Sequence, residues 1–377
     1  MRKTIAIFSP SLAGGGAERV MINLGKGFVD RGFPVDLVVS SAIGEYKSQL
    51  DQRINLVDLR CRRVATSLPR LIRYLRRELP SAMLSTQVHA NVVALSAGLL
   101  SGVATRFVVR DTFSPIGGAL LSMNSYRAYG IQWLASRLYS RAASVVAVCN
   151  DLRSEIAETF GLAADRIAVI YNPIAFDDIE AKAKLETDHD WLDAPSMPVV
   201  LSIGRLEAQK DFSTLIRAFA IVQSSMNARL VILGEGSLRS PLTELVQSLG
   251  LNDRVDMPGF VDNPYAYIAR ANAFVLSSIF EGLPNALLEA LALGTPLVST
   301  DCRTGPREIL RNGQDGILVP VGDIAALAEG IRSALTSGTR TSAPSESLQR
   351  FEFDHIVDQY LGLLCPEYAT REAKVHC

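Results

Sequence analysis

The sequence has few of the residues that mark a metal site or a disulfide-stabilised fold. Its 377 residues include only five cysteines and four histidines. The cysteines are far apart, with no Cys-x-x-Cys pair and no histidine at metal-ligand spacing; they are Cys61, Cys149, Cys302, Cys365 and Cys377. A zinc site and a disulfide framework are therefore not predicted, and this cysteine usage is typical of a reducing cytoplasm.

Long apolar runs are also missing. No window holds 18 apolar residues in succession, and the longest apolar-rich stretch, residues 92–109, contains polar serines and an arginine. A membrane-spanning helix is therefore not predicted. The first apolar run, residues 4–8, ends at Ser9 and Pro10, which indicates a first strand without signal-peptide character.

The length and charge of the chain indicate two dissimilar halves. A chain of 377 residues exceeds the usual size of one hydrophobic core, so two domains are expected. The net charge is only −1, yet residues 1–172 carry 21 Lys and Arg against 12 Asp and Glu, and the remainder carries 17 against 27. The basic and the acidic half are therefore expected to meet different partners.

The N-terminal half begins with a pattern typical of a βαβ unit. A strand at residues 4–8, a glycine-rich loop, a helix at residues 18–31 and a strand at residues 35–39 follow one another. The loop, residues 14–19, reads Gly-Gly-Gly-Ala-Glu-Arg and lets backbone approach a ligand. It is not Gly-x-Gly-x-x-Gly, and Ser40 follows the second strand where dinucleotide folds have an acidic residue. A nicotinamide or flavin dehydrogenase is therefore disfavoured.

Further strands complete this half and carry candidate ligand contacts at their ends. They are predicted at residues 82–85, 108–111, 144–148 and 167–170. His89 follows the first of them, and Arg110 and Asp111 end the second. A lone histidine is more often structural than catalytic, and both interpretations of His89 are kept. Residues 1–172 are predicted to form one doubly wound domain.

An arginine-rich segment stands out between the second and third of the strands in this half. Seven arginines occur between residues 60 and 77, and apolar residues recur at helical spacing through residues 68–79. One interpretation is a surface helix that packs its apolar stripe on the sheet. The other is a basic amphipathic helix that lies on anionic lipid. Nucleic acid is disfavoured because only Tyr74 is interleaved for stacking.

The C-terminal half is predicted to form a second doubly wound domain. Residues 173–198 are acidic and end in prolines, which indicates a linker. Strands alternate with helices over residues 199–350; the strands are predicted at residues 199–203, 230–233, 255–257, 273–276, 297–300 and 317–319. Residues 351–377 are expected to form a helix and tail that pack back on the N-terminal domain.

Two strand-loop-helix connections in this half carry charged groups. After the first strand, Gly204 and Arg205 are followed by Lys210 ahead of a helix start, which favours either a diphosphate grip or solvated loop cations. After the fourth strand, residues 280–289 read Phe-Glu-Gly-Leu-Pro-Asn-Ala-Leu-Leu-Glu. The two glutamates of this stretch are expected near one helix N-terminus, where phosphates and nucleotides bind in α/β proteins. An ordinary connection with solvated glutamates is the alternative.

Taken together, these motifs resemble the retaining, nucleotide-sugar-dependent glycosyltransferases of family four, of the bacterial polysaccharide and glycolipid type. The resemblance covers nearly the whole chain and rests on the glycine loop at residues 14–19, the phosphate grip at residues 204–210, the Glu-x7-Glu signature at residues 281–289 and the Gly-Pro-Arg-Glu-Ile sequence at residues 305–309. It implies the α/β GT-B fold, in which two Rossmann-like doubly wound domains face each other across a cleft.

The resemblance also implies roles for single residues. Glu281, Arg205 and Lys210 would be catalytic, with the two cations stabilising the departing diphosphate. Glu289 would hold the ribose, and the other expected donor-binding residues are Gly15, Gly16, Gly204, Glu235, Gly282, Leu283 and Asn285. Many relatives have a histidine where this chain has Arg110 and Asp111. The candidates for sugar or acceptor contacts are therefore His89, Arg110 and Asp111.

The activity implied is transfer of a hexose or N-acetylhexosamine from a UDP- or GDP-sugar to a saccharide or lipid-linked saccharide, in the synthesis of cell-surface polysaccharide, lipopolysaccharide or glycans. No cofactor and no metal are expected, because the cations take the place of a metal. The expected location is cytoplasmic and peripheral on the inner face of the membrane. The alternatives are a nucleotide-sugar epimerase or hydrolase of the same fold, or an inactive donor-binding subunit.

Overall fold

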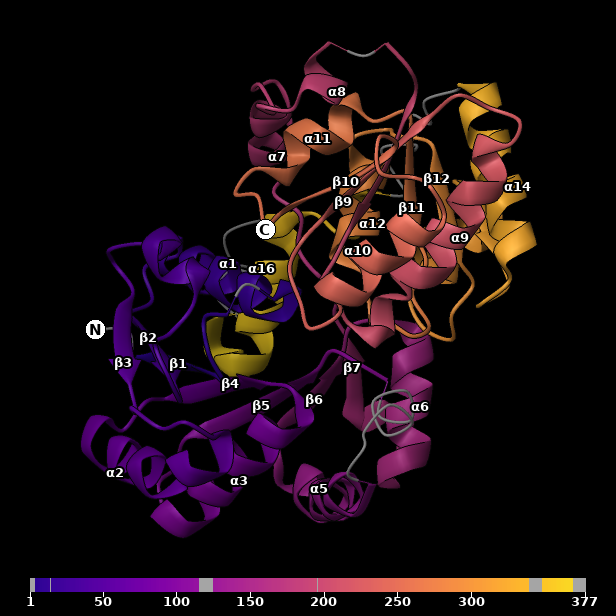
Figure 1. Cartoon of the computed structure of the whole chain (residues 1–377). Helices are drawn as coiled ribbons and strands as arrows, with labels where there is room; N and C mark the ends of the chain where they lie inside the picture. The colour runs from indigo at the N-terminus through magenta and orange to yellow at the C-terminus, as the bar shows by residue number, and fades with distance from the viewer. Residues whose placement is uncertain (1–3, 14, 115–124, 195, 339–347, 369–377) are drawn as a thin grey trace. The chain divides into compact units, whose positions relative to one another are not determined.

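The computed structural model describes residues 4–13, 15–114, 125–194, 196–338 and 348–368, with the side chains of residues 125–128 excepted. The chain divides into two compact units, one of Met1–Pro173 with Arg350–Cys377 and one of Ile174–Gln349 (Figure 1). Each unit is built on a parallel sheet flanked by helices, which confirms the expected α/β class.

The sheet of the first unit has seven parallel strands in the order β3-β2-β1-β4-β5-β6-β7. The strands are β1 (Ile5–Ser9), β2 (Val35–Val39), β3 (Asn55–Asp58), β4 (Ala82–Thr86), β5 (Arg106–Asp111), β6 (Ser144–Ala147) and β7 (Ile167–Val169). β1, β2 and β4 are buried along their whole length, as expected where helices cover both faces. β3 is not predicted from the sequence, because this half-exposed edge strand has polar residues at both ends.

Helices cover both faces of this sheet. Their bounds are α1 (Gly16–Asp30), α2 (Leu68–Glu78), α3 (Val88–Ser101), α5 (Ser125–Leu138), α6 (Asn150–Phe160) and α16 (Phe353–Leu364). Figure 1 shows α1 and α16 on one face, and α2, α3 and α5 on the other. The segment following β5, residues 115–124, is not among the described residues.

Helix α2 packs its apolar stripe inward. Leu71 and Leu75 are fully buried, and the hydroxyl of Tyr74 donates a hydrogen bond to Asp36 on β2, at 2.6 Å. Of the two interpretations of this segment, the structure therefore shows the surface helix with its stripe in the core. Leu71 and Leu75 are therefore part of the protein interior, whereas Leu79 at the end of the helix is 63% exposed. The interpretation of this segment as a membrane-binding helix stays a prediction.

The C-terminal helix α16 completes the core of the first unit. Val357 and Leu361 are fully buried in the same cluster as residues of α1 and of the central strands. Gly27 of α1 allows close packing, since a Cβ atom there would lie 2.5 Å from the Val357 side chain. Arg31 forms ion pairs with Asp354 and Asp358 of α16.

The two places where the chain leaves and re-enters the first unit are joined by an edge-to-face aromatic contact. The ring centroids of Tyr171 and Phe351 lie 5.0 Å apart. The guanidinium of Arg350 lies over both rings, at 5.4 Å and 4.6 Å from their centroids. Cation–π contacts of this kind hold the two chain segments together within the first unit.

The second unit has a six-stranded parallel sheet in the order β10-β9-β8-β11-β12-β13. Its strands are β8 (Val199–Ile203), β9 (Arg229–Leu233), β10 (Val255–Gly259), β11 (Ala273–Leu276), β12 (Leu297–Thr300) and β13 (Ile317–Val319). Its helices are α7 (Phe176–Ala183), α8 (Asp190–Asp193), α9 (Phe212–Gln223), α10 (Arg239–Ser248), α11 (Pro264–Arg270), α12 (Asn285–Ala292), α13 (Pro306–Ile309) and α14 (Ile324–Ser337).

The segment expected to be a linker, residues 173–198, contains two helices of the second unit. Both α7 and α8 pack against α11, and the hydroxyl of Tyr267 donates a hydrogen bond to the Thr187 carbonyl at 2.6 Å. The acidic composition of this segment reflects exposed helix faces, so the sequence analysis missed its helices. Among the described helices, none combines the length and the apolar character needed to cross a bilayer.

Candidate active site

The candidate site of the second unit lies where the strand order of its sheet reverses. The chain runs outward from β8 through β9 to β10, and then returns to place β11 on the other side of β8. At such a switch point the loops after two neighbouring strands diverge and leave room for a ligand at their carboxyl ends. Here the loops after β8 and β11 carry Lys210 and Glu281, respectively.

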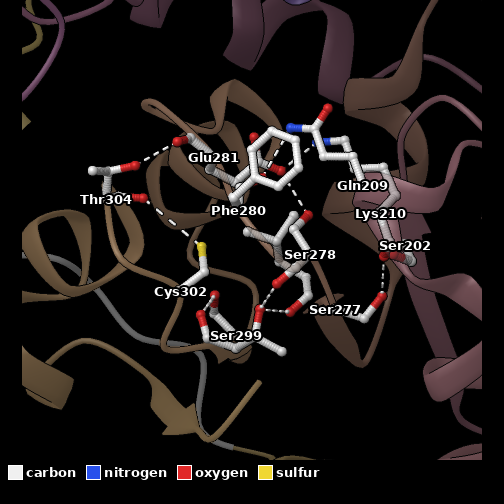
Figure 2. A network of polar contacts seen from close by, with 12 residues as sticks. Ser202, Gln209, Lys210, Ser277, Ser278, Phe280, Glu281, Ser299, Cys302 and Thr304 are labelled. Atoms are coloured by element: carbon white, nitrogen blue, oxygen red, sulfur yellow. Dashed lines mark hydrogen bonds and ion pairs between the residues drawn. The ribbon is translucent and has the colours of Figure 1, made fainter. Parts of the chain in front are cut away.

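A single carboxylate oxygen organises the centre of this site (Figure 2). Glu281 Oε1 accepts hydrogen bonds from the ammonium of Lys210 at 2.5 Å and from the hydroxyl of Ser278 at 2.6 Å. The Glu281 side chain is only 5% exposed. Its second oxygen, Oε2, has no hydrogen bond within the described part of the chain. One face of a nearly buried carboxylate is therefore fixed, and the other oxygen remains for a further donor.

The backbone of the Glu281 loop is held from both sides. Gln209 Nε2 donates to the Phe280 carbonyl at 2.9 Å, and the Gln209 carbonyl accepts from the Ile279 N–H at 2.8 Å. From the opposite side, the hydroxyl of Thr304 donates to the Glu281 carbonyl (Figure 2). Satisfied backbone groups in a buried loop restrict its movement, so the carboxylate is positioned before a ligand arrives.

Three further residues of this site, Ser278, Gln209 and Thr304, are not among the site residues predicted from the sequence. Ser278 lies three residues before Glu281, and Thr304 directly precedes the Gly305 motif. Their positions next to recognised motifs are the feature of the sequence that could have identified them as site residues. Serine, threonine and glutamine are frequent in loops, however, so residue type alone did not distinguish them.

Glycines let the loops of this site approach one another closely. Gly234 has φ +131°, and a Cβ atom there would lie 2.1 Å from the Gly204 carbonyl oxygen. Gly305 has φ +94°, and its Cβ would lie 2.3 Å from the Gly282 carbonyl oxygen. Gly204 itself lies against the Lys210 side chain, whose aliphatic carbons are 3.1–3.2 Å from a Cβ built there. Glycine is thus required where backbone meets backbone.

A buried thiol lies on the same network. Cys302 is 3% exposed, and its sulfur contacts the Thr304 carbonyl at 3.8 Å. Burial, followed by the negative charge of Glu281, raises the pKa of the Cys302 thiol. The thiol therefore stays protonated at neutral pH and serves as packing rather than as a nucleophile.

The segment from Gly282 to the start of α12 places further predicted residues beside Glu281. Gly282 and Leu283 are buried, Asn285 is half-buried at the first residue of α12, and Glu289 is 6% exposed within that helix. Pro284 is the N-cap residue of α12. The two glutamates of the signature are thus both buried.

The two other charged residues predicted here differ in their surroundings. Arg205 is exposed, and its guanidinium has no hydrogen bond to any residue that the structure describes. Glu235 is half-exposed and forms an ion pair with Arg239 at 2.8 Å. Hydrogen bonds from Ser237 lower the pKa of the neighbouring Glu207 carboxyl, with a smaller contribution from the charge of Arg205. The loops near the Lys210–Glu281 pair therefore carry an exposed cation, Arg205, and a carboxylate, Glu235, that is paired with Arg239.

The predicted residues of the first unit lie at the carboxyl ends of β1 and β4. Gly15 is the N-cap residue of α1 and Gly16 its first residue, whereas Gly14 lies outside the described residues. His89 is half-buried in the first turn of α3, directly after β4. All three positions belong to the edge of a parallel sheet where α/β proteins bind ligands.

Arg110 and Asp111 do not fit the role of ligand contacts. Both are fully buried. The guanidinium of Arg110 donates to Thr86 Oγ1 at 3.2 Å and to Asn172 Oδ1 at 2.5 Å. These partners belong to the first unit, so Arg110 is part of its interior.

Asp111 points into a separate polar cluster. Its Oδ1 accepts hydrogen bonds from Asn91 Nδ2 and from the Tyr139 hydroxyl, both at 2.8 Å. Burial raises the pKa of the Asp111 carboxyl to about 7. Neither side chain reaches the surface, so the structure gives no support to the prediction that Arg110 or Asp111 contacts a sugar. The sequence placed both at a strand end but could not show which way they point.

Comparison with known proteins links both units to glycosyl transfer. Residues 14–178 match the family described as Glycosyltransferase Family 4, and residues 186–351 match Glycosyl transferases group 1. The N-acetylgalactosamine-N,N'-diacetylbacillosaminyl-diphospho-undecaprenol 4-alpha-N-acetylgalactosaminyltransferase of Campylobacter jejuni is 29% identical over 342 residues, which cover 88% of this chain and 90% of that protein. The lipopolysaccharide core biosynthesis glycosyltransferase LpsE of Rhizobium meliloti is 35% identical over 188 residues, covering 48% and 52%.

Solved structures agree on the fold. HepE of Anabaena in complex with UDP superposes with a TM-score of 0.77 at 21% identity and covers 96% of this chain and 99% of that chain. Sucrose-phosphate synthase of Thermosynechococcus elongatus gives a TM-score of 0.81 at 20% identity, covering 98% and 100%. These likenesses confirm the expected GT-B fold.

Proposed function

This chain belongs to the glycosyltransferases of family four, and we propose that it transfers a hexose or N-acetylhexosamine, with retention of configuration, from a UDP- or GDP-sugar to a lipid-linked saccharide. The product would enter the synthesis of cell-surface polysaccharide, lipopolysaccharide or glycan. The observation that carries the proposal is the Glu281 carboxylate, which is held through one oxygen by Lys210 and Ser278 while its other oxygen remains for a ligand.

The charges at the site suit a nucleotide diphosphate donor. Arg205 and Lys210 supply two cations beside the carboxyl end of β8, and negative charge develops on the diphosphate as the glycosidic bond breaks. Cations held in place before the reaction stabilise that charge without reorganisation. In this proposal the two cations have the role that a metal ion has in other enzymes, so a chelator should leave the activity unchanged.

The carboxylates suit the hydroxyl-rich parts of the donor. We assign Glu281 Oε2 to a hydroxyl of the transferred sugar and Glu289 to the ribose. Backbone groups of Gly282, Leu283 and Asn285 would hold the diphosphate near the start of α12. In the proposed reaction the acceptor hydroxyl attacks the face from which the nucleotide leaves, and its proton passes to the departing phosphate oxygen.

The choice of acceptor rests on the relatives. The name of the Campylobacter jejuni protein describes transfer of N-acetylgalactosamine to a diphospho-undecaprenol-linked saccharide, and LpsE is named for lipopolysaccharide core synthesis. Both names refer to a lipid-linked molecule, diphospho-undecaprenol in one and lipopolysaccharide in the other. A lipid-linked saccharide is therefore the acceptor class that we propose for this chain.

The test uses a labelled donor with and without lipid-linked acceptors. Glu281→Gln and Lys210→Ala should each lower turnover by about 10²- to 10³-fold, because each removes a group that acts on the reacting sugar or the diphosphate. Glu329→Gln, the same chemical change on the exposed face of α14, should leave turnover unchanged. Near-normal activity in both site variants would contradict the assignment.

The same assay separates the alternatives. A nucleotide-sugar epimerase or hydrolase would consume the labelled donor without an acceptor. An inactive donor-binding subunit would bind nucleotide tightly and turn over with no acceptor in a broad panel. The buried carboxylate and its paired cation at the centre of the site favour an active transferase, since a decayed site has no reason to retain a costly buried charge pair.

A further inference from the structure

Three helices of the first unit form one continuous outer layer. α3 packs between α2 and α5 on the face of the sheet opposite α1 and α16 (Figure 1). The ends of α2 and α3 are tied together, because Arg76 donates hydrogen bonds to the carbonyls of Leu100 at 3.0 Å and Ser101 at 3.2 Å. Side chains at the ends of these helices therefore share one surface.

This layer exposes an unusual share of large apolar side chains. Leu79 ends α2 and is 63% exposed, and Leu99 and Leu100 near the end of α3 are each 56% exposed. On α5, Tyr129 and Trp133 are 67% and 60% exposed. These five account for nearly half of the eleven exposed large apolar side chains in the described part of the chain. Several large apolar side chains exposed on one layer of helices indicate an interaction surface.

Helix α5 presents its aromatic residues together with a cation. Tyr129 and Trp133 are four residues apart, so they lie on the same side of the helix. One turn further on, the guanidinium of Arg137 lies 5.1 Å from the Trp133 ring centroid. Tryptophan and tyrosine side chains flanked by arginine are typical of the boundary between water and the acyl chains of a bilayer.

The same region carries a strong charge of one sign. Residues 60–141 contain twelve arginines and no lysine against two acidic residues, a net charge of +10 in a chain whose total is −1. One of the two acids, Asp111, is fully buried. The arginines that are exposed include Arg62, Arg63, Arg73, Arg77, Arg137 and Arg141. A surface with this charge attracts an anionic partner over a Debye length.

We propose that the layer formed by α2, α3 and α5 docks on an anionic phospholipid bilayer through the exposed side chains of Leu79, Leu99, Leu100, Tyr129 and Trp133 and through its exposed arginines. The apolar side chains would enter the interfacial region, and the arginines would contact lipid phosphates. Nucleic acid explains the arginines but not the exposed leucines, which have no role in binding a phosphate backbone. Of the apolar stripe of α2, Leu71 and Leu75 are buried and take no part in this contact, whereas Leu79 is exposed and belongs to the docking residues.

The protein contains a natural reporter for this contact. It has two tryptophans, Trp133 on the proposed face and Trp191 in the second unit. Trp191→Phe keeps an aromatic ring under the Arg229 guanidinium, which lies 4.5 Å from the Trp191 ring centroid, and leaves Trp133 as the single fluorophore. In the full chain carrying this substitution, we expect vesicles of phosphatidylcholine with phosphatidylglycerol to shift the emission to shorter wavelength. Vesicles of phosphatidylcholine alone should not.

Cosedimentation with the same vesicles tests the residues. Leu99→Ser with Leu100→Ser, and separately Arg73→Ser with Arg77→Ser, should each weaken binding by about tenfold or more. The matched controls are Ile43→Ser, an exposed apolar residue of the same unit outside this layer, and Lys26→Ser with Lys47→Ser, which removes the same charge elsewhere in that unit. Both controls should bind like the parent chain.

The outcomes separate clearly. Equal binding to neutral and anionic vesicles, no binding at low salt, or equal losses in test and control variants would each overturn the proposal. Tight binding to duplex DNA with no binding to vesicles would assign the face to nucleic acid instead. Vesicle binding is measured without donor or acceptor. The docking proposal can therefore be contradicted while the proposed transferase activity is observed, and the transferase activity can be absent while docking is observed.

Discussion

The ammonium nitrogen of Lys210 lies 2.5 Å from Glu281 Oε1, with the two side chains 18% and 5% exposed. A cation and a carboxylate this close to the interior stabilise one another, and either alone is costly to bury. Lys210→Met should therefore lower the free energy of unfolding by roughly 3 kcal/mol, since it leaves the Glu281 charge without its partner. The double variant Lys210→Met, Glu281→Gln should lose less than the sum of the two single losses. Urea unfolding of all four proteins measures this coupling, and additive losses would show that the pair is not coupled.

Gly234 should be needed for the shape of the donor site. An alanine Cβ at this position would meet the Gly204 carbonyl oxygen at 2.1 Å, so the loop after β8 must move. We expect Gly234→Ala to abolish the thermal shift that UDP- or GDP-sugars give the parent protein. Gly250→Ala is the matched control, because Gly250 also has a positive φ but its Cβ would meet nothing within 4 Å. It should cost about 1 kcal/mol in stability and keep the donor response. A normal shift in Gly234→Ala would contradict the requirement.

Asp111 should make stability depend on pH near neutrality. Burial raises the pKa of its carboxyl from 3.8 to about 7 in the folded protein. Below the pKa of the unfolded chain the buried carboxyl is fully protonated, and its whole contribution to stability is present. That contribution is lost as the pH rises through about 7, so the free energy of unfolding falls with increasing pH. Asp111→Asn cannot ionise.

The measurement for Asp111 compares the two proteins by urea unfolding at about pH 5 and about pH 8. The variant should gain stability relative to the parent as the pH rises between these values. An identical difference between the two proteins at both pH values would show that Asp111 does not titrate in this range.

The contact between α1 and α16 should tolerate no side chain at Gly27. A Cβ atom there would lie 2.5 Å from Val357 and 3.2 Å from the Phe353 ring, so Gly27→Val should cost about 1–3 kcal/mol or more through overpacking. Gly362 on α16 has nothing within 4 Å of its Cβ position. Gly362→Ala should instead stabilise the helix by about 0.5–1 kcal/mol. Thermal unfolding of both variants tests the contact, and a Gly27→Val protein as stable as the parent would refute it.

The sequence predicted the strands of both sheets well, because parallel strands covered on both faces are short, continuous apolar runs. It failed where that pattern breaks. β3 is an edge strand with Asn55 and Asp58 at its ends, and α7 and α8 present acidic residues to solvent that suggested a linker. The same limit applied to the arginine-rich helix, since periodicity shows that an apolar stripe exists but not which surface covers it.

At the candidate site, the charged residues could be predicted from the sequence, whereas the groups that they contact could be found only from the fold. Glu281 and Lys210 belong to recognisable motifs, yet their contact joins residues 71 positions apart in the chain. Ser278 and Thr304, which hold the Glu281 side chain and backbone, carry no motif of their own. Arg110 and Asp111 looked equally placed for a ligand, and only their packing against Asn172 and Tyr139 shows that both face inward.

The position of α16 in the chain sets an order for biosynthesis. The core of the first unit includes Ile356, Tyr360 and Leu361, which leave the ribosome only after residue 352 has been made. All of the second unit, Ile174–Gln349, has been synthesised by then. The second unit can therefore fold during translation. Until α16 has been made, the apolar face of α1 that packs against it remains uncovered. The core of the first unit is thus completed only after the second unit has been synthesised, and a nascent chain that stops before α16 has that core open.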